Sequence, residues 1–149
     1  MDHEDDILKE EHSRLVISMN GISQDPGKTG KAFSEVLKIF QYHLDREEGT
    51  VVPLLSYLKE RMCKGGRTVD DSLVTAADNL SVELESMLEE HRQIEDLLGR
   101  IMDLPKEKQT EMALEIVAEL RHHVALEEQM LYPAAMAATE LIKLKKKTC

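Results

Sequence analysis

Apolar residues return every three or four positions through most of this chain, which is the period of an amphipathic helix. Near the N-terminus the stripe consists of Leu8, His12, Leu15, Met19 and Ile22. Similar stripes continue to the C-terminus, and the β-branched residues never cluster into the alternating pattern of a half-buried strand. The pattern predicts four long helices, over residues 5–22, 26–52, from about 68–71 to 102, and from Pro105 onward.

Prolines mark the expected ends and breaks of these helices. The Asp25-Pro26 pair fits the N-cap and first turn of the second helix. Pro53 is expected to break or kink that helix, with a short helical continuation over 54–61. Pro133 is expected to interrupt the fourth helix, before a helical pattern resumes over 134–147.

Four amphipathic helices joined by short turns can bury their stripes against one another, which predicts an all-α fold, an antiparallel up-down four-helix bundle. The composition agrees, because aromatic residues make up only 3% and Trp is absent, while Leu, Glu, Lys, Ala and Met are plentiful. The 149 residues are expected to form one domain, 1–149.

Charge and hydropathy exclude several classes of partner. The net charge of −10 argues against nucleic acid, which needs clustered Lys and Arg. No apolar stretch approaches the roughly 20 residues of a membrane span, and the acidic N-terminus MDHEDD has no secretory h-region. Cys63 and Cys149 are too few for a disulfide framework, so we expect free thiols in the cytoplasm.

The two halves of the chain resemble each other. Glu10-Glu11-His12 matches Glu89-Glu90-His91, and the block from His43 to Pro53, HxxxEExxxxP, matches the block from His123 to Pro133. Each half, about 4–62 and 83–142, is therefore expected to be a helical hairpin, and two hairpins make the bundle.

The repeat carries residues that can hold a metal. His12, His43, His91 and His123 fall on the apolar stripes, one in each helix, and Glu47 and Glu127 follow their histidines by four residues. Residues four apart share a helix face, so each pair can reach one ion. Burying four imidazoles and two carboxylates is costly without a cation. Core histidines satisfied by neighbours are the alternative.

The kind of ligand narrows the choice of metal. Imidazole and carboxylate without thiolate suit iron, manganese or zinc. Six ligands are too many for one tetrahedral zinc and suit two ions that share bridging carboxylates. A ferritin-like site would need Glu-x-x-His on two helices, but only Glu119-x-x-His122 fits, and its counterpart Ile39-x-x-Tyr42 does not.

These motifs together resemble the hemerythrin-like family, also called the HHE cation-binding domain, over residues 4 to 140. The resemblance implies a non-haem di-iron centre, two iron ions (Fe2+/Fe3+) with a bridging oxygen species, inside an up-down bundle. In that arrangement His12 and His43 bind one iron, and His91 and His123 bind the other. Glu47 and Glu127 bridge the two ions.

The chain departs from the oxygen-carrying marine-worm hemerythrins at two positions. Those proteins place a His one turn after the third-helix His, where this chain has Glu95, and an Asp five residues after the last His, where it has Glu128. Glu127 repeats the geometry of the first hairpin, so we expect it to be the bridge. Glu95 is expected to lie at the centre and to ligate the iron held by His91 and His123.

This ligand set is more similar to the family members linked to iron sensing, to nitric oxide or peroxide handling, and to repair of iron centres. We therefore expect a protein that binds or reacts with dioxygen or a related small oxidant, with binding favoured over catalysis. An iron- or oxygen-responsive sensor, a repair protein and a structural metal bundle are the alternatives.

Other residues near the motifs have simpler expected roles. His122 is expected at the surface or beside the ligands, and Tyr132 in core packing. Glu48 and Glu128 are expected either to accept hydrogen bonds from ligand histidines or to face solvent. An apolar pocket beside the metals is expected from Leu15, Phe40, Ile94 and Leu120.

Overall fold

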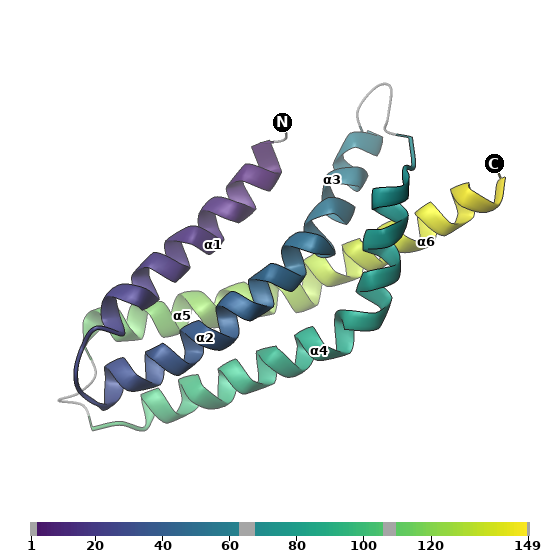
Figure 1. The fold of residues 1–149 in the computed structure, drawn as a ribbon. Helices are drawn as coiled ribbons and strands as arrows, with labels where there is room; N and C mark the ends of the chain where they lie inside the picture. The colour runs from purple at the N-terminus through teal and green to yellow at the C-terminus, as the bar shows by residue number, and fades with distance from the viewer. Residues whose placement is uncertain (1–2, 63–67, 106–109, 149) are drawn as a thin grey trace.

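The computed structural model describes residues 3–62, 68–105 and 110–148, and within these ranges it contains helices and turns but no strand. Figure 1 shows the helices packed as an up-down bundle, which confirms the predicted all-α four-helix architecture. The end of α1, the start of α2 and the end of α4 lie at one end of the bundle (Figure 1). The helices are α1 (His3–Ile22), α2 (Lys28–Gly49), α3 (Val51–Met62), α4 (Asp71–Met102), α5 (Glu111–Leu126), the π-helical turn η2 (Glu127–Leu131) and α6 (Tyr132–Thr148).

The turn between α1 and α2 differs from the expected Asp25-Pro26 cap. Helix α2 begins at Lys28, and Gly27 is its N-cap, without a side-chain hydrogen bond. The Asp25 carboxylate instead accepts a hydrogen bond from the N–H of Gly27, at 2.8 Å. A Cβ at Gly30 would lie 1.9 Å from the carbonyl oxygen of Asp25, so this close approach of turn and helix requires glycine.

Side-chain caps begin the next two long helices. The Asp70 carboxylate accepts a hydrogen bond from the N–H of Leu73, at 3.0 Å, and places the start of α4 within the predicted range. The Thr110 hydroxyl accepts one from Ala113, at 3.1 Å, so α5 begins at Glu111. The prediction that Pro105 opens this helix is wrong, because Thr110 supplies the cap.

The two repeated prolines follow two different irregular turns. The break in the first hairpin comes at Thr50, and Pro53 is the third residue of α3, where a missing N–H is tolerated. Pro133 does not interrupt its helix as predicted. The chain passes through η2, in which the N–H of Tyr132 reaches the carbonyl of Glu127, and continues directly into α6. Cys63 and Cys149 lie outside the described residues.

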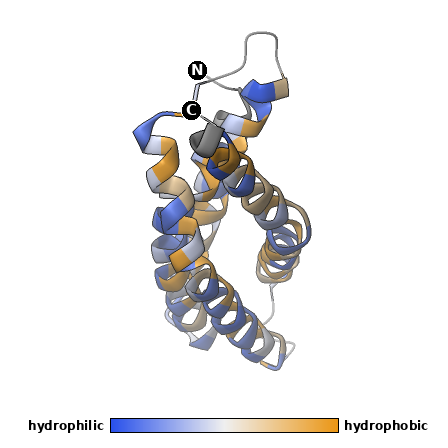
Figure 2. Ribbon diagram, turned by 90° about the vertical axis from the view of Figure 1, so that its right-hand side faces the viewer, coloured by the Kyte–Doolittle hydropathy of each residue, from blue (hydrophilic) through white to orange (hydrophobic). Residues whose placement is uncertain are grey.

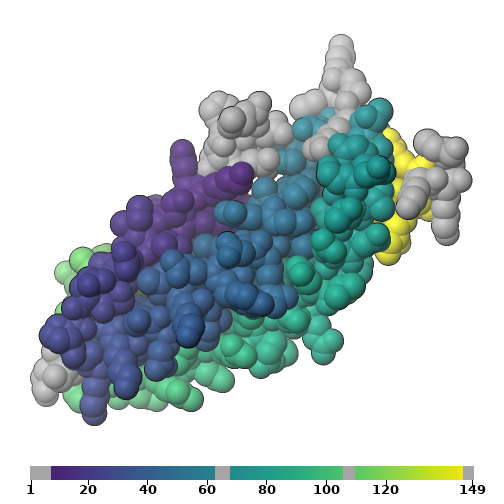
Figure 3. Space-filling model, viewed as in Figure 1, coloured from purple at the N-terminus to yellow at the C-terminus, as the bar shows by residue number. Residues whose placement is uncertain are grey.

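The apolar core has two parts. One lies between α1, α2, α4 and α5 and includes Leu15, Phe40, Ile94 and Leu120. The other lies between α3, α4 and α6 and includes Met87 and Tyr132. Hydrophobic and hydrophilic residues alternate around each helix (Figure 2), and α1 and α2 pack side by side on the face that Figure 3 shows. In the described residues no helix has an apolar stretch long enough to cross a membrane.

Candidate metal centre

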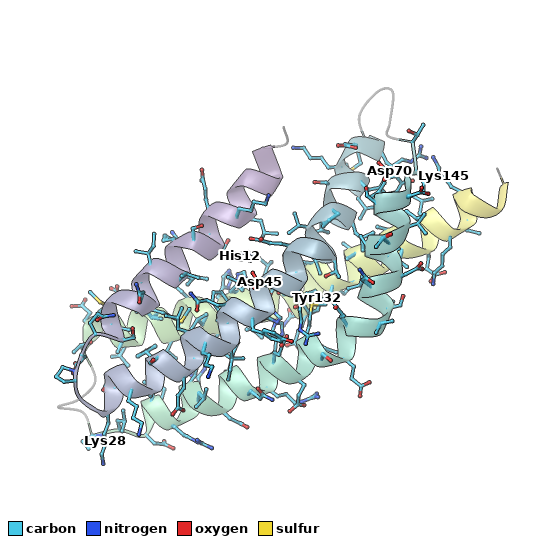
Figure 4. All side chains as sticks on the ribbon, viewed as in Figure 1. His12, Lys28, Asp45, Asp70, Tyr132 and Lys145 are labelled. Atoms are coloured by element: carbon cyan, nitrogen blue, oxygen red, sulfur yellow. The ribbon has the colours of Figure 1, made fainter. Side chains whose placement is uncertain are left out.

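Six of the seven predicted ligands lie together in the middle of the bundle. They come from α1, α2, α4, α5 and the first residue of η2, and none is more than 2% exposed: His12, His43, Glu47, His91, His123 and Glu127. Figure 4 shows His12 of α1 in this middle region, between Lys28 at one end and Asp70 and Lys145 at the other. The inward stripe predicted from the sequence therefore places these side chains correctly.

The six residues form two overlapping groups of four, each of which could hold a cation. The first site consists of His12, Glu47, His123 and Glu127. The second site consists of His43, Glu47, His91 and Glu127. In each group one possible ligand atom per residue lies within 4.8 Å of all the others. Both glutamates belong to both sites, which is the arrangement that two bridging carboxylates require.

The distances show how the two glutamates connect the sites. Oε2 of Glu47 lies 3.6 Å from Nε2 of His12, while its Oε1 contacts Nε2 of His43. Oε1 of Glu127 lies 3.1 Å from Nε2 of His91 and 3.4 Å from Nε2 of His123. Each carboxylate therefore reaches one histidine from each site.

The histidines pair across the hairpins. The rings of His12 and His123 have centroids 5.0 Å apart, and those of His43 and His91 are 4.5 Å apart. The resemblance implied instead that His12 shares an ion with His43. The structure differs from that pairing, because each group of possible ligands combines one histidine from each hairpin, His12 with His123 and His43 with His91.

Glutamates outside the ligand set orient two of the histidines. Nδ1–H of His123 donates to Oε1 of Glu11, at 2.8 Å, and Nδ1–H of His43 donates to Oε1 of Glu90, at 3.1 Å. A proton fixed at Nδ1 leaves the Nε2 lone pair facing the centre. Neither glutamate was predicted to take part in the site, although both occupy the same place in the repeat, one residue before His12 and His91.

The hydrogen bond between His43 and Glu90 is part of a chain of contacts that extends through Arg46 to Tyr42 at the surface. Nε of Arg46 lies 3.3 Å from Oε2 of Glu90, and the guanidinium also donates to the hydroxyl of Tyr42, at 3.0 Å. It stacks over the Tyr42 ring, 4.7 Å from the centroid. Arg46 therefore holds the Glu90 carboxylate from the side opposite His43.

Tyr132 is part of the site rather than simple core packing. Its hydroxyl donates to Oε1 of Glu47, at 2.8 Å, and lies 3.2 Å from Nε2 of both His43 and His91. On a regular α-helix Tyr132 would lie about 140° around the axis from Glu127. The wider η2 turn places residues five apart above one another, so Tyr132 and Glu127 share the inward face.

Glu95 does not lie at the centre, and this prediction is wrong. Its side chain is 54% exposed and pairs with Arg121, whose Nη2 lies 2.8 Å from Oε1. Ile94 and Leu98, which are buried, lie roughly 60° and 20° to one side of His91, whereas Glu95 lies roughly 40° to the other. His91 lies at the edge of the buried face of α4, so Glu95, one turn later, lies beyond that edge and faces solvent.

The remaining neighbours lie near or at the surface. His122 and Glu48 are exposed. Glu128 is 42% exposed, with Oε2 3.8 Å from Nδ1 of His91, which is beyond hydrogen-bonding distance. Leu15, Phe40, Ile94 and Leu120 are buried, each three residues from a site histidine, and the pocket that they were expected to line stays a prediction.

The site binds protons strongly when no cation neutralises it. Burial lowers the pKa of His43, but its hydrogen bonds to Glu127 and Glu47 outweigh burial and raise that pKa to about 10. Burial also lowers the pKa of His123, but the nearby Glu127 carboxylate, with Oε1 3.4 Å from Nε2, and the Glu11 carboxylate outweigh burial and raise that pKa to about 9. Burial and the nearby Glu127 raise the pKa of Glu47 to about 8.

The pKa values of His12 and Glu127 are lowered instead. Burial and the neighbouring His123 lower the pKa of His12 to about 4. Burial alone would raise the pKa of Glu127, but the adjacent Glu47 carboxyl and the three histidines that surround Glu127 hold it well below its usual range. The raised pKa values favour the protonated forms of His43, His123 and Glu47, so a cation has to displace protons from these groups.

The donor atoms fit a bound cation. Five buried atoms of the first-site residues have no hydrogen-bond partner among the described residues: Nδ1 and Nε2 of His12, Oε2 of Glu47, Nε2 of His123 and Oε2 of Glu127. Each residue of the site contributes at least one such atom. Buried polar atoms without partners are costly, and a cation shared by the four residues would satisfy one such atom from each.

The comparisons with known proteins agree with this chemistry. A family model described as "Hemerythrin HHE cation binding domain" matches residues 3–135, which include all six clustered ligands. A comparison with curated proteins gave no match, and a comparison with solved structures gave none.

Proposed function

Because the chain belongs to the hemerythrin HHE cation-binding domain family, we propose that it is a non-haem di-iron protein. We propose further that it binds or reacts with dioxygen or a related small oxidant, such as nitric oxide or hydrogen peroxide. The observation that carries this proposal is the sharing of Glu47 and Glu127 by two four-residue sites in a closed core.

The donor set supports iron as the cation. Four imidazoles and two carboxylates, without thiolate, are ligands that iron accepts in either oxidation state. Two iron ions held side by side would supply two electrons at one place. The two anionic carboxylates favour Fe(III) over Fe(II), so the reduced centre is expected to oxidise readily.

The protein's own residues would control access and orientation. Leu15, Phe40, Ile94 and Leu120 are buried beside the histidines and exclude water from that side of the centre. Glu11 and Glu90 hold two imidazoles with Nε2 facing inward. The Tyr132 hydroxyl donates its proton to Oε1 of Glu47 and can keep that carboxylate in place.

Reaction with oxygen tests the proposal. Protein purified with iron and reduced anaerobically is exposed to oxygen, which is then removed, while the absorption spectrum is recorded. We expect a short-lived oxygen adduct that decays to the diferric state, and reaction with nitric oxide or hydrogen peroxide. Full recovery of the colourless diferrous spectrum over several cycles would instead show a reversible carrier.

Two controls complete the test. The variant His12→Ala, which lacks one donor of the first site, should lose the reaction, whereas His122→Ala, changed at an exposed position, should keep it. An iron-loaded protein that reacts with none of the three oxidants would contradict the proposed function. Zinc bound tightly in place of iron would favour the structural alternative.

A further inference from the structure

The two cation sites are not equivalent. In the second site, Nε2 of His43 and Nε2 of His91 lie 3.0 Å apart, and the latter is 3.1 Å from Oε1 of Glu127. The Tyr132 hydroxyl donates to Oε1 of Glu47 and lies within 3.2 Å of both imidazoles. The Nε2 atoms of both histidines of the second site therefore have partners, either each other or the Tyr132 phenol.

The first site has no such group. The Nε2 atoms of both its histidines, His12 and His123, are buried and without hydrogen-bond partners in the described part of the chain, as is Oε2 of each of the two shared glutamates. In the first hairpin the residue at the repeat position of Tyr132 is Val52. Val52 is buried, but its side chain has no polar atom to offer to a carboxylate or an imidazole.

We propose that the two sites fill in a fixed order, the first site before the second, and that Tyr132 sets this order. The inference rests on the proposed function only in requiring that the centre binds two cations. A cation in the first site satisfies two imidazole nitrogens, Nε2 of His12 and Nε2 of His123, that otherwise have no partner. A cation in the second site must replace hydrogen bonds that are already made, so it gains less.

A comparison of single-site variants identifies the site that fills first. Cobalt(II) is the probe, because it has the charge of Fe(II), binds such ligands at least as tightly and does not react with oxygen in the same way. Native mass spectrometry counts the ions bound while a chelator competes for them. We expect His91→Ala to retain the tighter cation-binding step and to lose the weaker one. His12→Ala should lose the tighter cation-binding step.

Replacement of Tyr132 tests its part in the order. Tyr132→Phe removes only the hydroxyl, so the second site should bind its cation more tightly relative to the first. The ratio of the two stepwise dissociation constants should fall by up to about tenfold, the upper end of what one buried hydrogen bond contributes. Tyr57→Phe is the matched control, because Tyr57 is also fully buried but its hydroxyl has no partner in the described residues. It should leave the ratio unchanged.

In any two-cation centre, repulsion between the cations makes the second cation bind more weakly than the first. A difference between the two dissociation constants therefore does not by itself show that Tyr132 sets the order. The proposal is overturned if His91→Ala removes the tighter step, or if Tyr132→Phe leaves the ratio unchanged or increases it. If a variant fails to fold without metal, the chelator is added to cobalt-loaded protein, and the single-ion species that persists is assigned in the same way. A wild-type chain that binds no cation would overturn the proposed function as well, whereas two ions without the expected order would overturn only this inference.

Discussion

Glu11 of α1 accepts a hydrogen bond from His123 of α5, with 2.8 Å between Oε1 and Nδ1. The two residues are 112 positions apart in the chain, and the contact joins the first hairpin to the second. The same relationship recurs between Glu90 of α4 and His43 of α2. Both imidazoles are thereby fixed in the tautomer that faces the metal centre.

The first prediction concerns this orientation. Glu11→Ala should lower cation affinity by about 10- to 100-fold, because the freed imidazole can rotate and change tautomer. Glu10→Ala is the matched control, since Glu10 precedes it on the same helix and is exposed. Cobalt(II) titration of both variants measures the effect. Equal affinities for the two variants would show that Glu11 does not support the site.

The second prediction separates Glu95 from the true centre. Glu95→Ala should leave the number of bound cations unchanged and alter the free energy of unfolding by no more than about 1 kcal/mol, because it removes only an exposed ion pair with Arg121. Glu127→Ala should abolish binding of both cations, since Glu127 belongs to both sites. Metal analysis and urea denaturation supply the measurements. A loss of one cation in Glu95→Ala would restore Glu95 to the ligand set.

These residues show what the sequence could predict. The inward positions of Glu47 and Glu127 follow from helix periodicity, because each lies one turn after a histidine on a buried stripe. Glu95 has the same spacing, but His91 lies at the edge of the buried arc, and periodicity alone does not locate that edge. The arc depends on which neighbours α4 packs against, which is a tertiary property.

The position of Tyr132 in the metal centre could not be predicted from the sequence, for a different reason. Its inward direction depends on η2, which shifts the helical phase between Glu127 and Pro133. The proline signals an irregularity but does not say whether the chain breaks, as at Thr50, or widens into a π-helical turn. The roles of Glu11 and Glu90 could have been predicted from the sequence, because each glutamate directly precedes a ligand histidine at the same place in the repeat.

The third prediction tests the register of the last hairpin. His123→Ala should lose the stabilisation that the cation provides, which is about 2.7 kcal/mol at a hundredfold excess over the dissociation constant. His122→Ala should change the melting temperature of the loaded protein much less, because His122 is exposed. Thermal unfolding with and without cation measures both. The reverse pattern would mean that His122, and not His123, faces the centre.

The fourth prediction concerns pH. The folded-state pKa values of His43, His123 and Glu47 are raised to about 10, 9 and 8, above their unfolded values. Groups with raised pKa values stabilise the fold fully below their unfolded pKa and lose that contribution as the pH rises through the folded pKa. The metal-free protein should therefore lose stability between pH 6.5 and 9.

Cation binding should show the opposite trend over the same range. The cation must displace protons from these groups, so its affinity should rise with pH. The lowered pKa values of His12 and Glu127 act only below about pH 6.5 and do not affect this window. Urea denaturation at pH 6.5 and 9, with and without cobalt(II), measures both trends. A cation-induced stabilisation that is equal at the two pH values would contradict the prediction.

The central claim, a di-iron centre built on Glu47 and Glu127, is tested most directly by metal analysis combined with an absorption spectrum. The protein is produced in iron-replete cells and purified in air, and iron and zinc are quantified per chain. We predict two iron ions per chain and a charge-transfer band from the oxidised, bridged centre. One iron per chain, or mostly zinc without such a band, would contradict the account.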